Sequence, residues 1–379
     1  MVENLDFNSI RPYEDNEIHE VFERLKEEKT FLELIHFLYP NFSVEDFLNQ
    51  LLKIKTIREF QFQVIYPYVK EIIKNTTEGI SFSGLDKLDP ESSYLYISNH
   101  RDIVLDSAIL NILLVENGFD TTEIAIGDNL LIFPWITDLV KLNRSFIVKR
   151  NLPTRQLMDS SQRLSAYIRY VLNTKRRSVW IAQREGRSKD GDDRTQISLL
   201  KMLNIAGESS INKNFESLNI VPVSISYELD PCDYLKAFEF QQKRDDKSYQ
   251  KTQNDDLKHM GAGLKGRKGR VHFAFGTPLN KVNISNDNDS KNDQIAKIGQ
   301  LIDEQIHKNY KLWPANYIAC DYLCPEQQYR NKYSEEDLRK FKYYIEDHIN
   351  RISNPDREFI FDTLMEMYAN PVRNSVCQK

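Results

Sequence analysis

Two patterns of hydrophobic residues alternate along the middle of the chain. Longer amphipathic runs with helical spacing lie at about 106–117, 129–141, 155–173 and 195–206. Between them and after them lie short runs rich in β-branched and aromatic residues, namely SYLYIS, EIAIGD, SFIVK, SVWIAQ, NIVPVSISYE and RVHFAFG. Strand patterns that alternate with helical patterns long enough to cross over predict an α/β fold, with a mostly parallel sheet flanked by helices.

Both ends of the chain have helical patterns instead. Residues 1–78 and 295–379 are expected to form helical N-terminal and C-terminal segments. The polar, low-complexity run at 283–294 predicts a linker. This organisation leaves residues 79–282 as the domain that carries the chemistry.

The residues that follow each predicted strand are the first candidates for function, because ligands bind beyond the carboxyl ends of strands in open α/β sheets. His100 follows the first strand, with Asp102 and Asp106 nearby. A histidine with a carboxylate close by can act as a general base, because the carboxylate fixes the tautomer and stabilises the imidazolium. The alternative is a loop histidine beside an aspartate that caps a helix.

The sequence His100-Arg101-Asp102-Ile103 is similar to the H-R-D-L loop of protein kinases. That loop requires Asn at the position that Ser107 occupies here, and a downstream D-F-G segment is missing. A kinase is therefore not expected.

Cations follow two further strands. Arg150 ends the run that begins at Ser145, with Arg144 and Lys149 beside it, and a basic, glycine-containing segment from Arg184 to Gly191 follows another strand. Both could hold an anion such as a phosphate, although exposed strand-end charges are the alternative. The second segment lacks the order of residues of a nucleotide-binding P-loop. A third basic segment, GAGLKGRKGR at 261–270, predicts either a mobile loop that contacts phospholipid head groups or a solvated loop.

Five blocks in this order resemble the glycerolphosphate and lysophosphatidate acyltransferase superfamily, whose members have an H-x4-D motif. The resemblance covers about residues 80–280. The blocks are YISNH, SFIVKR, QREGRSKDG, IVPVSISYE and FGTPL. In this chain Asp106 lies six positions after His100, where the family has five, and Leu105 occupies the family's aspartate position.

The resemblance implies an O-acyltransferase of phospholipid biosynthesis that uses no cofactor and takes acyl-CoA or acyl-carrier protein as co-substrate. His100 would be the base with Asp106 as its partner, and Asp102 is the alternative partner. Arg150 and Arg187 would bind the phosphate of glycerol 3-phosphate or a lysophospholipid, and Glu185 and Gly186 would complete the acceptor pocket. The alternative from another class is a non-catalytic lipid-binding protein that has kept the fold.

Composition limits the partners and the location. The formal net charge of -5 gives no field that would attract nucleic acid. The acidic start of the chain does not resemble a secretory signal, and no run of about 18 apolar residues predicts a membrane span. A cytoplasmic protein is expected, with peripheral contact on the inner face of the membrane. The four cysteines lack the spacing of a zinc site, so no metal is expected.

Overall fold

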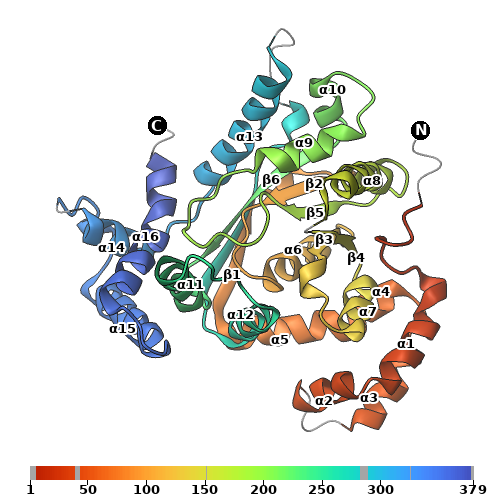
Figure 1. The fold of residues 1–379 in the computed structure, drawn as a ribbon, viewed down its shortest axis with the longest axis horizontal. Helices are drawn as coiled ribbons and strands as arrows, with labels where there is room; N and C mark the ends of the chain where they lie inside the picture. The colour runs from red at the N-terminus through yellow and green to blue at the C-terminus, as the bar shows by residue number, and fades with distance from the viewer. Residues whose placement is uncertain (1–5, 39–42, 151, 282–288, 325, 377–379) are drawn as a thin grey trace.

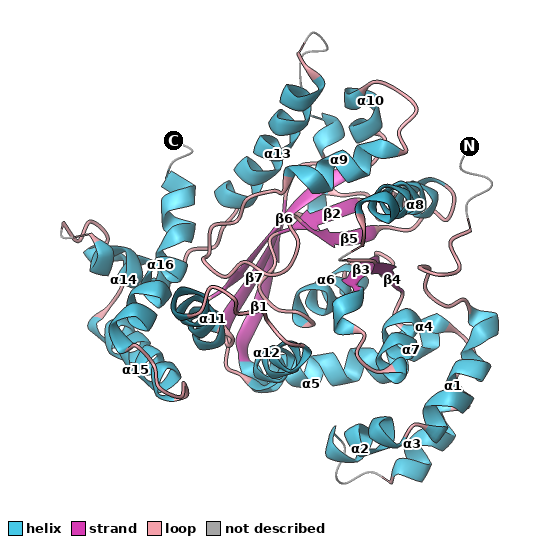
Figure 2. Ribbon diagram, in the orientation of Figure 1, coloured by secondary structure: helices cyan, strands magenta, loops and turns pink. Residues whose placement is uncertain are grey.

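The protein is built around one seven-stranded sheet, shown in a computed structural model (Figures 1 and 2). The structure describes residues 6–38, 43–150, 152–281, 289–324 and 326–376. The strands are β1 (Thr77–Ser83), β2 (Leu95–Ser98), β3 (Glu123–Gly127), β4 (Ser145–Val148), β5 (Val179–Ala182), β6 (Ile220–Tyr227) and β7 (Gly269–Phe275). Their order in the sheet is β1-β7-β6-β2-β5-β3-β4. All neighbours are parallel except β6 and β7, which confirms the α/β fold with a mostly parallel sheet.

Strands β2, β5 and β6 form the centre of the sheet. Leu95 of β2 pairs with Val179 of β5 on one side and with Ile220 of β6 on the other. Every residue of β2 and β6 is buried, as expected for strands covered on both faces. The carboxyl ends of β2 to β6 therefore share one edge of the sheet with the amino ends of β1 and β7.

Helices cover both faces of the sheet and create two hydrophobic cores (Figure 2). One face is covered by α5 (Tyr66–Thr76) and α6 (Leu105–Glu116). The other is covered by α8 (Thr154–Asn173), α9 (Ile197–Ile205), α10 (Ile211–Glu216) and α13 (Lys291–Lys308). The helices α7 (Pro134–Leu142), α11 (Asp233–Asp245) and α12 (Gln253–Lys265) complete the central part of the chain.

The two ends of the chain pack as separate helical clusters on this framework (Figure 1). The N-terminal cluster contains α1 (Ile18–Glu27), α2 (Lys29–Leu38), α3 (Val44–Leu51) and α4 (Ile57–Phe60), followed by a π-helical turn (Gln61–Ile65), and it packs against Leu142 of α7. The C-terminal cluster contains α14 (Pro314–Leu323), α15 (Glu335–Asn350) and α16 (Arg357–Val376), and it includes Ala237 of α11.

Strand β1 was not expected from the sequence. It lies at the edge of the sheet, beside β7, and most of its residues are exposed. The pairing register shifts between Thr77 and Ile80, where Gly79 has a φ of 116°. An exposed, irregular edge strand needs few apolar residues, so it leaves little hydrophobic alternation in the sequence.

Two further predictions from the sequence need correction. The segment 261–270 is not a mobile loop, because residues 261–265 belong to α12 and residues 269–270 to β7. Its arginines are paired as well, Arg267 with Glu78 and Arg270 with Glu228. The predicted linker at 283–294 overlaps α13 from Lys291 onward, and its residues 283–288 lie outside the described residues. The division of the chain into three parts stays a prediction.

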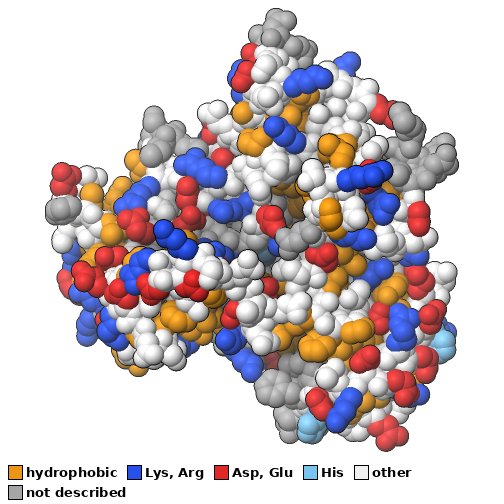
Figure 3. Space-filling model, in the orientation of Figure 1, with side chains coloured by type: hydrophobic (Ala, Val, Ile, Leu, Met, Phe, Trp, Pro, Cys, Tyr) orange, Lys and Arg blue, Asp and Glu red, His pale blue; other side chains and the backbone are white. Residues whose placement is uncertain are grey.

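The surface is mixed in charge. Figure 3 shows basic, acidic and hydrophobic side chains interspersed over the face that it presents. Within the described ranges, no helix has both the length and the apolar character needed to cross a bilayer.

Candidate active site

His100 lies just beyond β2, at the edge of the sheet that collects the carboxyl ends of five strands. Its Nδ1 atom is 2.8 Å from Oδ2 of Asp106, in the first turn of α6. A carboxylate can only accept, so Nδ1 donates, and in the neutral ring Nε2 then keeps its lone pair. No residue in the described part of the chain forms a hydrogen bond with Nε2, and the ring borders a cavity.

The carboxylate of Asp106 is held by the backbone that leads into the helix. Oδ2 also accepts from the amides of Arg101 at 2.6 Å and Asp102 at 3.1 Å. The residue is fully buried, and its place at a helix N-terminus favours a negative charge. The five residues between His100 and Asp106 form a turn that brings both side chains together, despite the one extra residue.

Asp102 has a different role in the structure. Its Oδ1 accepts from the amides of Val104 at 2.9 Å and Leu105 at 2.8 Å, so it caps α6. Burial and the neighbouring Asp106 raise the pKa of this carboxyl. Of the two candidate partners, Asp106 therefore contacts the His100 ring and Asp102 binds the helix end.

Two aromatic side chains enclose this pair. The Trp180 indole and the His100 ring pack in a T-shaped arrangement, with 5.5 Å between ring centroids, and Nε1 of Trp180 donates to Ser98 at 3.1 Å. Tyr227, at the end of β6, is buried, and burial together with the charges of Asp106 and Asp102 raises its pKa well above the usual value. The dyad is therefore in a largely desolvated environment, where electrostatic interactions are stronger than in water.

His100 borders a cavity of about 630 Å³. This volume lies within the range of ligand pockets for small molecules. Its wall is largely apolar and comes from helices far apart in the sequence: Tyr68, Val69 and Ile72 of α5, Val140 of α7, Leu164 of α8, Met202 of α9 and Leu264 of α12. The cavity therefore offers an apolar compartment next to the dyad.

Cations gather on one wall of the cavity. Lys149, Arg150 and Arg184 all border it, together with Glu185 and Gly186. Arg150 is 3.5 Å from the exposed carboxylate of Glu185, and its backbone amide donates to Asp128 at 3.1 Å. Neither Arg184 nor Lys149 has a hydrogen bond or ion pair to any residue described. This wall has the cationic character that an anionic ligand requires.

Arg187 is not brought into this wall. Arg187 is buried, with 8% of its surface exposed. It is not among the residues that border the cavity. Its positive charge lowers the pKa of His259, after burial, and contributes to lowering that of Asp230. The Nη1 atom is buried without a hydrogen-bond partner in the described ranges. The amide of the next residue, Ser188, donates to the carbonyl of His100 at 3.0 Å, which places this turn beside the dyad.

The sequence predicted Arg187 as a phosphate ligand, whereas in the structure it is Arg184 that borders the cavity. Gly186 lies between them in a left-handed conformation, with a φ of 71°. The side chains on either side of it therefore point in different directions. The apolar residues of α5 and α12 were missed as well. Their amphipathic spacing was the available signal, but spacing does not tell which element a face will contact.

Comparisons with known proteins found one family match and one similar solved structure. Residues 79–226, from β1 to β6, match the family model described as Acyltransferase. No curated protein sequence matches the chain. Among solved structures, the chain is similar to the 1-acyl-sn-glycerophosphate (LPA) acyltransferase PlsC from Thermotoga maritima, with 9% identity and a TM-score of 0.34. That alignment covers 76% of this chain and 95% of the other.

Two glycines of α12 allow a matched test of the packing around the histidine loop. A Cβ on Gly263 would be 2.1 Å from Oδ2 of Asp102, a side chain fixed by two backbone hydrogen bonds, whereas a Cβ on Gly261 would meet nothing within 4 Å. We expect Gly263→Ala to reduce the free energy of unfolding by about 1–3 kcal/mol, because the crowded groups must shift. Gly261→Ala should stabilise slightly. Denaturant unfolding of both variants checks this, and equal stabilities would contradict the close packing.

Proposed function

We propose that this chain, whose residues 79–226 match the family model described as Acyltransferase, transfers a fatty acyl group to the hydroxyl of a phosphate-bearing glycerol compound. The acceptor would be glycerol 3-phosphate or a lysophospholipid, and the donor acyl-CoA or acyl-carrier protein. The observation that carries the proposal is the His100–Asp106 pair at 2.8 Å, bordering a cavity whose lining contains both apolar residues and cations.

His100 would act as the general base. With Nδ1 donating to Asp106, the lone pair of Nε2 is available to take the proton of the acceptor hydroxyl. The hydroxyl oxygen then attacks the thioester carbonyl, the C–S bond breaks, and the thiol leaves with a proton from the imidazolium. Asp106 stabilises the imidazolium between these two proton transfers. No acyl-enzyme intermediate is required.

The cationic wall would hold the acceptor phosphate. Arg150 and Arg184 border the cavity, and a guanidinium binds phosphate through two parallel hydrogen bonds that also fix its orientation. Arg187 does not border the cavity, but it stays the third proposed ligand, because its buried Nη1 has no acceptor among the described residues. Glu185 and Gly186 would shape the pocket, with Glu185 holding Arg150 when no substrate is bound.

The apolar wall would hold the acyl chain. Residues of α5, α7, α8 and α9 line it, and burial of methylene groups there is favourable at about 0.8 kcal/mol each. The acyl carbonyl would then lie beside His100, at the boundary between the apolar and cationic walls.

The mouth of the cavity would contact a membrane surface. Leu157 borders the cavity and is 49% exposed, while its neighbour Met158 is 62% exposed. Lys149 and Arg155 lie close by in the sequence, and neither forms a hydrogen bond or an ion pair with a described residue. Exposed apolar side chains together with free cations favour an anionic bilayer.

The direct test is an assay of the purified protein with acyl-CoA or acyl-carrier protein as donor, against glycerol 3-phosphate and lysophosphatidate. We expect acyl ester formation with at least one pair and none with His100→Ala, whose melting temperature should stay near that of the wild type. A wild-type protein that binds lipid vesicles but transfers no acyl group would support the non-catalytic alternative.

The two aspartates should respond differently to loss of charge. Asp106→Asn should lower kcat by roughly two to four powers of ten, because the ring loses its orienting carboxylate. Asp102→Asn should change kcat little, because Asn caps a helix about as well as Asp. Initial rates at saturating acceptor measure both effects, and a thermal melt controls for folding. The reverse order of effects would show that Asp102, and not Asp106, is the partner of His100.

The phosphate ligands can be tested with substrates as the control. Arg150→Gln and Arg184→Gln should each raise the KM for a phosphate-bearing acceptor by about tenfold to a hundredfold, the usual loss for a charge-assisted hydrogen bond. The KM for the phosphate-free monoacylglycerol should not change. Equal effects on both acceptors would show that these arginines do not bind the phosphate.

The mouth of the cavity can be tested by its affinity for vesicles. Replacing Leu157 and Met158 by Glu should weaken binding to anionic vesicles by about tenfold or more, because both apolar insertion and charge attraction are lost. Tyr343→Glu is the matched control, since Tyr343 is 77% exposed on α15, away from the cavity. Sedimentation with vesicles at two salt concentrations gives the affinities. Unchanged binding of the double variant would exclude this surface.

A further inference from the structure

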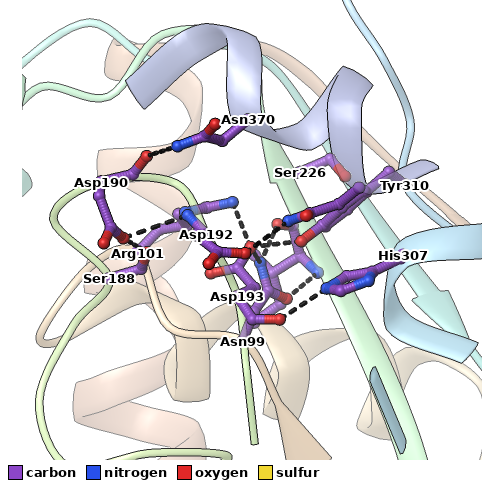
Figure 4. A network of polar contacts seen from close by, with 12 residues as sticks. Asn99, Arg101, Ser188, Asp190, Asp192, Asp193, Ser226, His307, Tyr310 and Asn370 are labelled. Carbon is purple, nitrogen blue, oxygen red and sulfur yellow. Dashed lines mark hydrogen bonds and ion pairs between the residues drawn. The ribbon is translucent and has the colours of Figure 1, made fainter. Parts of the chain in front are cut away.

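Asp193 is the centre of a buried network beside the candidate site (Figure 4). It lies in the loop between β5 and α9. Its Oδ2 atom accepts from Nδ2 of Asn99 at 3.2 Å, Nη2 of Arg101 at 2.5 Å and the hydroxyl of Tyr310 at 2.6 Å. Its carbonyl is 2.6 Å from Nε2 of His307. One residue therefore joins the end of β2, the loop after β5 and the C-terminal end of α13.

The first two partners of Asp193 are the chain neighbours of His100. Asn99 also forms two hydrogen bonds with the backbone of Ile225 in β6, at 2.7 and 2.9 Å. Burial lowers the pKa of Arg101, but the nearby groups of Asp193, Tyr310, Asp230 and Asp106 together raise it above its usual value, with Asp193 contributing most. Both residues next to the candidate base are thereby fixed by a single carboxylate oxygen.

The loop that contains Asp193 also carries Arg184 to Arg187. The C-terminal helix α16 holds this loop from outside, because Asn370 donates to the carbonyl of Asp190 at 2.7 Å (Figure 4). Asn374 of the same helix donates to Asp192 at 3.1 Å. Gly191 has a φ of 74°, and a Cβ there would be 2.2 Å from the carbonyl oxygen of Met367. The loop and α16 are therefore in direct backbone contact.

We propose that Asp193 is a positioning residue, which fixes His100 and the arginine-bearing loop relative to each other and makes the C-terminal helices part of the active-site framework. The inference rests on the proposed function. The physical reason is geometric: a base and a phosphate site must stay aligned, and a shift of about 1 Å between reacting groups can cost a hundredfold in rate. A buried carboxylate with three donors is a rigid link, because each donor would lose its partner if the loop moved.

Tyr310→Phe tests the proposal with a small change. It removes one hydroxyl from Asp193 and leaves the buried ion pair with Arg101 in place. Tyr344→Phe is the matched control, because this hydroxyl joins the C-terminal segment to the carbonyl of Asp230 at 2.9 Å and does not contact the loop after β5. Asp193→Asn is the stronger variant, but it leaves Arg101 buried without its counter-charge and is expected to unfold easily.

We expect Tyr310→Phe to lower kcat by about tenfold or more, with the KM for the acyl donor unchanged, because binding of the acyl chain does not depend on the loop. Tyr344→Phe should lower the melting temperature by a similar amount and leave kcat near the wild-type value. Equal kcat values for the two variants would overturn the positioning role. The positioning role would also be overturned if kcat fell in both variants in proportion to their loss of stability.

Hydrogen exchange provides a readout that does not depend on activity. The amide of Ser188 donates to the carbonyl of His100, so its exchange rate reports whether the loop stays on the histidine segment. We expect faster exchange over residues 184–193 in Tyr310→Phe and unchanged exchange in Tyr344→Phe. If the wild-type protein transferred no acyl group, the proposed function would fail while this exchange pattern could still hold. Unchanged exchange in both variants would refute the positioning role itself.

Discussion

The site depends on one desolvated carboxylate oxygen, Oδ2 of Asp106. It accepts from the His100 ring and from the amides of Arg101 and Asp102. Because the two amides turn toward this oxygen, the chain between β2 and α6 has little freedom, and the side chain of Asp102 is directed to the end of α6. An aspartate one residue later than the family pattern can thus still reach the ring. A spacing motif records the number of residues, whereas the chemistry requires only that the two atoms meet.

The cavity beside this carboxylate is assembled from elements that lie far apart in the sequence. Helix α5 belongs to the N-terminal helical region, whereas α12 follows β6, and both contribute apolar walls. The cations come from loops after β4 and β5, at the edge where parallel strands end. This division follows from the α/β fold itself, because helix faces supply apolar surface and strand ends supply loops with free polar groups. A substrate with a long apolar part and an anionic head matches both surfaces at once.

The sequence predicted those parts of the structure that have strong local signals. Strands β2 to β7 are buried and rich in β-branched and aromatic residues, so each was found close to its true position. The exposed edge strand β1 was not, since its pairing depends on β7, nearly two hundred residues later. His100 and its two candidate carboxylates were found because they follow a strand. Only three-dimensional geometry shows that Asp106 contacts the His100 ring and that Arg184 borders the cavity, because both depend on the direction of side chains in turns. Asp193 gave no sequence signal, because its partners are distant in the chain: Asn99 and Arg101 on one side, Tyr310 on the other.

The buried polar groups without a hydrogen-bond partner are spread over the described residues, and they include Oδ1 of Asp193 as well as Nη1 of Arg187. Each such group costs about 1–3 kcal/mol of stability. Near the dyad, burial and the charge of Asp106 raise the pKa of Tyr227, so this hydroxyl lies against the carboxylate that orients His100. Under the proposed function, a bound phosphate would supply the missing acceptor for Nη1 of Arg187, as expected of a site preorganised for its substrate.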